Sequence, residues 1–269
     1  MKIVSSPSEL GATLERPISA NLTGLVPTMG SLHEGHLSLI RMARSECSRV
    51  VVSVFVNPTQ FSETRDLDAY PRQLERDAAL ATDAGADVVF APSPEAMYPE
   101  GFATWVEPSE SATGLEGQMR PGHFRGVATV CLKLFNLIAP HRAYFGWKDA
   151  QQTAIVGQMI SDLNVPVTLR LGETVREPDG LALSSRNARL SADERARAKV
   201  LPEALRAGLA AHDADENARE ATLDVLQGDP QLTVEYVEEM TAHHHRLLCV
   251  AVRIGTTRLI DNMTLEESA

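Results

Sequence analysis

The chain has 269 residues, with 25 Lys and Arg against 36 Asp and Glu, so its formal net charge is −11. An apolar fraction of 43% and a charged fraction of 23% are typical of a globular protein and exclude a disordered or fibrous chain. The acidic balance argues against nucleic-acid or anionic-membrane binding, which requires a basic surface, whereas a few local cations suffice for an anionic substrate.

From residue 24 to residue 171 the chain alternates between short apolar runs and amphipathic segments. The run VVVSVFV at 50–56 is typical of a strand covered on both faces. The alternation predicts an α/β protein with a doubly wound, Rossmann-like parallel sheet, which binds ligands at the carboxyl ends of its strands. Expected strands are 24–28, 50–56, 87–91, 142–145 and 165–171, and expected helices are 36–47, 71–84, 126–138 and 149–163.

The pattern changes after about residue 187. Ser191 and Glu194 match a capping box that opens a long helix, and a second helix is expected near 216–226. Helices followed by consecutive strands predict a smaller α+β domain, and we place the two domains at residues 1–180 and 181–269. The expected strands of the second domain are 232–238, 247–254 and 257–261.

Cysteine usage and hydropathy give no sign of secretion or of a membrane span. Cys47, Cys131 and Cys249 lie far apart, without the spacing of a disulfide framework or a zinc site. No run reaches the roughly 18 apolar residues that cross a bilayer. The first ten residues also lack the apolar stretch of a signal peptide. We therefore expect a cytoplasmic protein.

The segment PTMGSLHEGH at 27–36 lies where the first predicted strand meets the first predicted helix. A helix N-terminus at that place binds phosphates through its unpaired N–H groups and its positive dipole end. His33 and His36 are three residues apart, not four as in the HExxH zinc motif. His-x-Gly-His in this setting is typical of the nucleotidyltransferase superfamily. The alternative is two ordinary histidines at the start of a helix.

Two further polar segments follow predicted strands. Asn57 and Gln60 bracket a proline turn, where their amides suit a polar substrate; the alternative is a simple turn. In FGWKD at 145–149, Gly146 permits close approach of a nucleotide, and Lys148 is a phosphate contact or a solvated lysine.

A third polar segment, VREPDGLALSSRN at 175–187, lies at the predicted domain junction. Its two hydroxyl groups and its arginine would close over a triphosphate, or the segment is an ordinary loop. The triplet His243-His244-His245 is interpreted as a loop and not as a metal site, because adjacent residues on an extended chain point in opposite directions.

Together these segments resemble the pantoate–β-alanine ligase (pantothenate synthetase) family. Further matches are YPR at 70–72, RPGHFRGV at 120–127, KLFNLI at 133–138 and RLIDN at 258–262, in the family's order and over nearly the whole chain. The resemblance implies a synthesis of pantothenate from pantoate, β-alanine and ATP through a pantoyl adenylate, with Mg²⁺. It also implies a homodimer.

The resemblance also implies roles for single residues. His36 is the expected proton donor, with His33, Lys148 and Arg186 beside it in catalysis. Pantoate is expected to meet Gln60 and Gln152, and β-alanine to meet Gln60. The expected ATP contacts are Met29, Gly30, Ser31, Leu32, His33, Glu34, Gly35, His36, Gly146, Trp147, Lys148, Asp149, Val175, Leu183, Ser184, Ser185 and Arg186.

The chain departs from the family pattern at Thr59, Trp147, Ala150 and Leu183, and Trp147 is the largest change in size and polarity. Two other functions are kept open. One is a nucleotidyltransferase with a different substrate, in which the FVNPTQF segment and the paired glutamines have no role. The other is a nucleotide sensor that has lost its activity, motivated only by Trp147 and Ala150. No metal ligands are assigned; Asp77 is a candidate near the Mg²⁺, and its alternative is a solvent-facing helix carboxylate.

Overall fold

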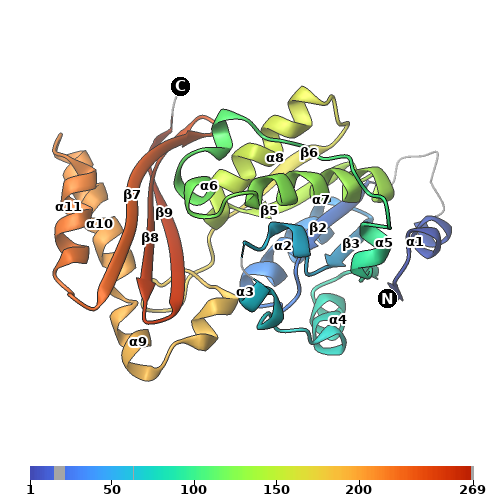
Figure 1. Cartoon of the computed structure of the whole chain (residues 1–269), viewed down its shortest axis with the longest axis horizontal. Coiled ribbons are helices and arrows are strands. Elements are labelled where there is room, and N and C mark those ends of the chain that lie inside the picture. Colours follow the sequence, from blue (N-terminus) through green and yellow to red (C-terminus); the bar gives the residue numbers. More distant parts are fainter. Residues whose placement is uncertain (15–21, 63, 268–269) are drawn as a thin grey trace. The chain divides into compact units, whose positions relative to one another are not determined.

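The structure is a computed structural model that describes residues 1–14, 22–62 and 64–267. The chain forms two compact units (Figure 1). The first consists of Met1–Gly146 with Gln151–Gly172, and the second of Trp147–Ala150 with Glu173–Ala269. The division into domains at residues 180 and 181 stays a prediction.

The first unit contains a six-stranded sheet in which every neighbouring pair is parallel, which confirms the predicted fold class. In the order β1-β4-β3-β2-β5-β6, the central strand β2 lies between β3 and β5, where the order of the chain reverses. Such a switch point is where open parallel sheets bind ligands. The strands are β1 (Lys2–Val4), which the sequence did not predict, β2 (Thr23–Thr28), β3 (Arg49–Val54), β4 (Val88–Phe90), β5 (Arg142–Gly146) and β6 (Thr168–Gly172).

Helices cover both faces of this sheet, because side chains along each strand alternate between the faces (Figure 1). Leu25 and Val51 pack with one set of helices, whereas their neighbours Val26 and Val52 pack with the other. The first set is α1 (Pro7–Leu14), α7 (His123–Ile138) and α8 (Ala150–Asp162), and the second is α2 (Glu34–Glu46) and α4 (Leu74–Asp83).

The second unit packs α10 (Val200–Asp213) and α11 (Ala218–Gln227) against an antiparallel sheet of three strands. The strands are β7 (Leu232–Ala242), β8 (His245–Ile254) and β9 (Thr257–Glu267). The Ser191–Glu194 capping box is confirmed, but the long helix it was expected to open is two helices, α9 (Ala192–Arg197) and α10.

Short elements connect the larger ones. They are α3 (Thr64–Asp68), α5 (Pro94–Met97), α6 (Leu115–Met119) and the 3-10 turns η1 (Pro58–Gln60), η2 (Glu110–Ala112), η3 (Trp147–Asp149) and η4 (Ser185–Arg189). Across the described residues, every helix is too short or too polar to cross a membrane.

Candidate active site

His33 and His36 lie at the start of α2, directly after the central strand β2. Their rings are 4.1 Å apart between centroids. His33 Nδ1 accepts the N–H of Gly35 at 3.2 Å, and His36 Nδ1 accepts the N–H of His33 at 3.3 Å, so the pair forms a capping box. A ring nitrogen that accepts a hydrogen bond carries no hydrogen, so each neutral ring carries its hydrogen on Nε2. The geometry therefore yields two Nε2–H donors at the positive end of a helix.

Gly35 serves this pair in a way that the sequence did not reveal. A Cβ atom at Gly35 would lie 3.0 Å from Cε1 and 3.1 Å from Nδ1 of His33. Glycine thus leaves room for the His33 ring to fold back over the first turn of α2.

Asp77 on α4 fixes the loop between β2 and α2. The residue is 1% exposed, and its carboxylate accepts the backbone N–H groups of Ser31 and Leu32, each at 2.8 Å. Gly30 and Ser31 both have positive φ values, 84° and 52°, a conformation that costs free energy for a serine. The solvent-facing alternative for Asp77 is wrong, and both carboxylate oxygens are engaged by backbone amides.

Gln60 is buried in the η1 turn after β3. Its Oε1 accepts from Asn57 Nδ2 at 3.0 Å, and its Nε2 lies 3.2 Å from the sulfur of Met29. Asn57 is held in turn, since its Oδ1 accepts from Thr59 Oγ1 at 2.9 Å and from the Tyr98 hydroxyl at 3.0 Å. Asn57 therefore holds the Gln60 side chain in place. Thr59, where the chain departs from the family pattern, in turn helps to hold Asn57.

The start of α7 holds the same turn from the other side. His123 Nδ1 lies 2.8 Å from the backbone oxygen of Gln60, and Gly126 O accepts from Asn57 Nδ2 at 3.1 Å. A Cβ atom at Gly126 would lie 2.5 Å from Thr59 O, so only glycine permits this approach. These contacts give the RPGHFRGV segment a structural purpose that the sequence did not assign.

The paired glutamines on α8 differ in their surroundings. Gln151 is buried and fixes the backbone of residues 111–116. Its Oε1 accepts the N–H of Glu116, and its Nε2 donates to the backbone oxygens of Ser111 and Gly114, all at 2.9 Å. Gln152, the expected pantoate contact, is half-buried.

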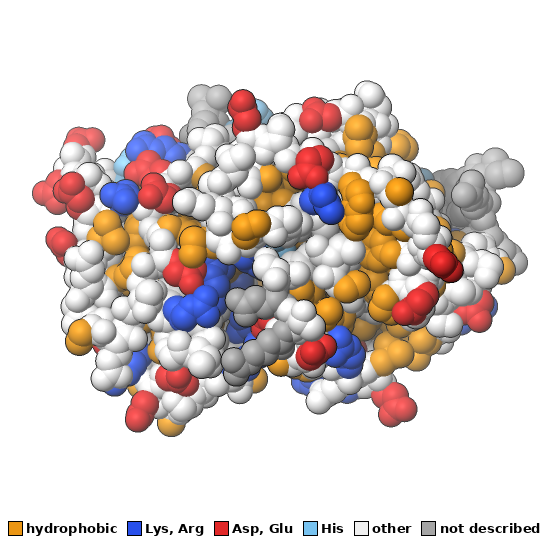
Figure 2. All heavy atoms as spheres, in the orientation of Figure 1, with side chains coloured by type: hydrophobic (Ala, Val, Ile, Leu, Met, Phe, Trp, Pro, Cys, Tyr) orange, Lys and Arg blue, Asp and Glu red, His pale blue; other side chains and the backbone are white. Residues whose placement is uncertain are grey.

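An aromatic cluster lies beside the Gln60 turn, where Figure 2 shows hydrophobic side chains gathered over α5 and the segment after it. Trp105 stacks on Tyr98 with centroids 6.1 Å apart, and Phe102 meets both rings edge-on. Burial raises the pKa of Tyr98, whose hydroxyl supports Asn57. A shallow pocket of about 380 Å³ is lined by Pro58, Thr59, Tyr98, Phe102 and Trp105, among others.

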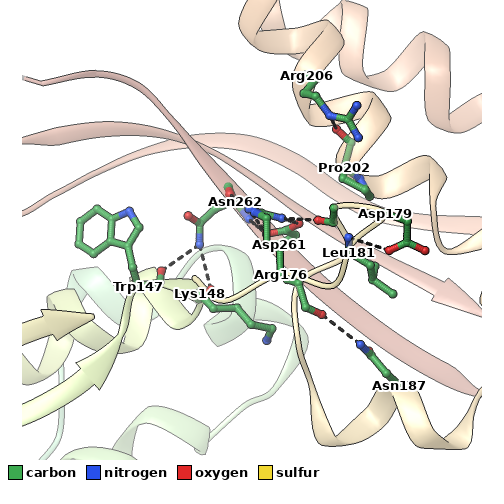
Figure 3. Close-up of polar contacts among 12 residues, drawn as sticks. Trp147, Lys148, Arg176, Asp179, Leu181, Asn187, Pro202, Arg206, Asp261 and Asn262 are labelled. Carbon is green, nitrogen blue, oxygen red and sulfur yellow. Dashed lines mark hydrogen bonds and ion pairs between the residues drawn. The ribbon is translucent and has the colours of Figure 1, made fainter. Parts of the chain in front are cut away.

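In the second unit, the η3 turn carries Trp147, Lys148 and Asp149. The Lys148 ammonium lies 3.8 Å from Asp149 Oδ1, and its side chain is 17% exposed. The Trp147 ring packs against His243 and His245, at 5.8 Å and 5.3 Å between centroids. Figure 3 shows that the Trp147 and Lys148 side chains leave the turn in different directions. The departure at Trp147 is thus accommodated by the β7–β8 hairpin.

The histidine triplet is the turn of that hairpin. His243 and His244 have φ values of 48° and 66°, and His245 begins β8. The expectation of a loop is confirmed, but its stated reason, an extended chain, is wrong, since the backbone turns sharply there.

The segment from Val175 to Arg186 forms a small folded loop in the same unit. Val175 O accepts the N–H of Leu183 at 2.9 Å. The Ser184 side chain caps η4, which contains Ser185 and Arg186, by accepting the N–H of Arg186 at 3.2 Å. Asn187 Nδ2 donates to Glu177 at 3.0 Å and so ties the end of the segment to its start.

The described residues include no group of three or more His, Cys, Asp or Glu side chains that could hold a metal ion. Both oxygens of Asp77 accept a backbone N–H group, and its place near Mg²⁺ stays a prediction. Magnesium commonly binds through substrate phosphates with few protein ligands.

Comparison with known proteins assigns the chain to a family. The family model described as pantoate-beta-alanine ligase matches residues 2–264. Curated relatives called pantothenate synthetase include one from Roseiflexus sp. (strain RS-1), 50% identical over 99% of this chain and 100% of the relative. Another, from Deinococcus radiodurans, is 50% identical over 92% of this chain and 95% of the relative.

Solved structures agree with this assignment. Pantothenate synthetase from Thermus thermophilus aligns with a TM-score of 0.93 and 45% identity over 98% of this chain and 99% of that one. The ligase from Francisella tularensis, in complex with a β,γ ATP compound and β-alanine, aligns with a TM-score of 0.88 and 37% identity over 98% of each chain. The chain belongs to the pantoate–β-alanine ligase family of enzymes.

Proposed function

We propose that this protein joins pantoate to β-alanine at the expense of ATP, giving pantothenate, AMP and pyrophosphate. The observation that carries the proposal is the His33–His36 pair at the head of α2, at the switch point of the parallel sheet, with Gln60 held close to Met29 on the neighbouring strand end. ATP and β-alanine are also the compounds named in the Francisella complex.

The first step forms a pantoyl adenylate. A carboxylate oxygen of pantoate attacks the α-phosphorus of ATP, and the bond from that phosphorus to the bridging oxygen breaks, so pyrophosphate leaves with the electron pair. Negative charge grows on the leaving group as the bond breaks. His36 and His33 donate hydrogen bonds to the leaving pyrophosphate through Nε2–H. Positive charge beside it comes from Lys148, Arg186 and the α2 N-terminus.

The second step uses the adenylate as an acyl donor. The free amine of β-alanine attacks the acyl carbon, AMP leaves with the electron pair, and the amine loses a proton. Gln60 and Gln152 hold pantoate, and Gln60 then orients β-alanine. No side chain becomes covalently modified in this scheme.

The proposed contacts to the nucleotide are those implied by the resemblance to the family. Met29, Gly30, Ser31, Leu32 and Glu34–His36 lie along the phosphates, and Gly146–Asp149 hold the ribose and phosphates. Val175 meets the adenine through its backbone, and Leu183, Ser184, Ser185 and Arg186 close over the phosphates. The Mg²⁺ expected from the resemblance would arrive on the ATP phosphates, and none of the steps above depends on a protein cage for it.

The decisive experiment is pantoate-dependent exchange of labelled pyrophosphate into ATP by the purified protein. The proposed ligase catalyses the exchange with pantoate and forms pantothenate when β-alanine is added. A nucleotidyltransferase of different specificity would show exchange with another acceptor, and an inactive sensor would show none. A homodimer and a cytoplasmic location stay predictions; light scattering of the purified protein tests the first.

A further inference from the structure

The middle of β9 carries two neighbouring buried side chains that reach different segments (Figure 3). Asp261 is 2% exposed and accepts from Arg176 at 2.7 Å and 3.0 Å. Asn262 is 4% exposed, and its Nδ2 donates to the backbone oxygens of Trp147 at 3.0 Å and Lys148 at 2.9 Å. This is the RLIDN segment, for which the sequence offered no role.

The two carbonyl groups bound by Asn262 belong to the peptide planes on either side of the Lys148 Cα atom. A residue's backbone has two soft dihedral angles, and these set the relation between its two flanking planes. Holding both planes therefore fixes the direction of the Lys148 Cα–Cβ bond. Asn262 thus controls where the Lys148 side chain leaves the turn, without touching that side chain.

Few side chains can do this. Two carbonyl acceptors require two N–H donors on one group, which the asparagine amide supplies. A serine hydroxyl supplies one donor and an ionised aspartate none.

The oxygen atom of the Asn262 side-chain amide argues against a role in stability alone. Asn262 Oδ1 is buried and has no hydrogen-bond partner among the described residues. Burying an unpaired acceptor costs free energy that an apolar side chain at this place would not incur. The amide is present in spite of that cost, which fits a side chain whose contribution is the geometry of the turn.

We propose that Asn262 is a positioning residue that holds the η3 turn so that Lys148 meets the phosphates of ATP. The proposal rests on the proposed function, in which Lys148 neutralises charge on the leaving pyrophosphate. Misplacement of a catalytic group by about 1 Å is enough to cost about 100-fold in rate.

The test compares Asn262→Ala with Asn217→Ala in pyrophosphate exchange. Asn217 lies in the same unit and caps α11 through the N–H of Glu220 at 3.1 Å, so its loss destabilises the unit without touching η3. We expect Asn262→Ala to lower the kcat of exchange about 10- to 100-fold, and to slow the coupling of supplied pantoyl adenylate to β-alanine much less. Asn217→Ala is expected to lower the midpoint of thermal unfolding and to leave both rates unchanged.

A second readout does not depend on activity. The chain has two tryptophans, so Trp105→Phe leaves Trp147 as a single fluorescent reporter on the turn. In that background, Asn262→Ala should shift the Trp147 emission and increase its quenching by acrylamide, whereas Asn217→Ala should change neither. If Asn262→Ala does not fold, Asn262→Ser, which keeps one donor, should show smaller changes in the same directions.

The outcomes separate the two claims. Wild-type protein without pantoate-dependent exchange would refute the proposed function, and the Trp147 emission would still show whether Asn262 holds the turn. Exchange in Asn262→Ala at the rate of Asn217→Ala, in a wild type that is active, would overturn the positioning role whatever the emission shows. An unchanged Trp147 emission in Asn262→Ala would overturn it as well.

Discussion

The carboxylate of Asp77 and the backbone N–H of Ser31 are 46 positions apart in the sequence and 2.8 Å apart in the structure. The second carboxylate oxygen accepts the N–H of Leu32 at the same distance. Through these two bonds, a helix on one face of the sheet sets the path of the loop that leads to His33 and His36. Asp77 thereby stabilises the loop conformation, in which Ser31 has a positive φ.

Replacing Asp77 by alanine should disorder this loop. Two backbone N–H groups lose their acceptor, at a cost of about 1–3 kcal/mol for each if they stay buried and unpaired. We expect a lower midpoint of thermal unfolding together with a raised KM for ATP in pyrophosphate exchange. Asp83→Ala, at an exposed position on the same helix, is the control. Equal kinetics in the two variants would show that Asp77 is dispensable for the loop.

His36→Ala should separate the two half-reactions. General-acid and electrostatic contributions at a leaving group are typically worth about 10²–10⁴ in rate. We expect pyrophosphate exchange to fall by about that range, and the coupling of supplied pantoyl adenylate to fall much less, because the second step expels AMP. Ser45→Ala on the same helix, at an exposed position, is the control. Equal losses in both half-reactions would instead mean that His36 only packs at the helix start.

Gln60→Ala should impair the reaction with both pantoate and β-alanine. Removal of one hydrogen-bonding partner in a buried site costs about 1–3 kcal/mol, so the apparent affinity for pantoate and the rate of coupling to β-alanine should both fall. Gln60→Glu replaces the Nε2 donor by a negative charge, and it should raise the KM for pantoate further than alanine does. Gln158→Ala, exposed on α8, is the control. Wild-type constants for both substrates in Gln60→Ala would rule out the assignment.

Glu46 gives the first unit a pH-dependent contribution to stability. Hydrogen bonds from the Arg170 guanidinium, and also from the Tyr144 hydroxyl, lower the pKa of Glu46 from its ordinary value of 4.5. Because the folded-state pKa is lowered, the stabilisation is fully present above pH 4.5 and is lost as the pH falls through the folded-state pKa.

Glu46→Gln should therefore lower the free energy of unfolding at pH 7 by about 1.5–3 kcal/mol, the usual value of hydrogen bonds to charged groups. The difference from wild type should shrink as the pH falls below 4.5. Urea unfolding of both proteins between pH 3 and pH 7 measures this, with Glu75→Gln at an exposed position of α4 as the control. A difference that stays constant with pH would contradict the assignment to the ionised carboxylate.

The sequence was sufficient for the main elements of the fold. Apolar runs such as 50–56 and the periodic segment 126–138 carry local signals, and β3 and α7 form there. It did not predict β1 or α3, because three or five residues hold too little periodicity to stand out. The break between α9 and α10 was also missed, although the sequence carries a reason for it: Pro202, in the first turn of α10, has no N–H to donate to Ala198, so a continuous helix cannot run through this point.

For the candidate site, the sequence by itself determined which residue types stand at the strand ends: two histidines after β2, an amide after β3, and a lysine after β5. Strand-end placement follows from local pattern, because the connectivity of a parallel sheet brings successive carboxyl ends to one edge. Only the tertiary structure decided which residues hold these groups in place. Asp77, Gly126 and Asn262 lie far along the chain from the atoms they fix, and such contacts arise from packing between elements, which leaves no periodic signal in the sequence.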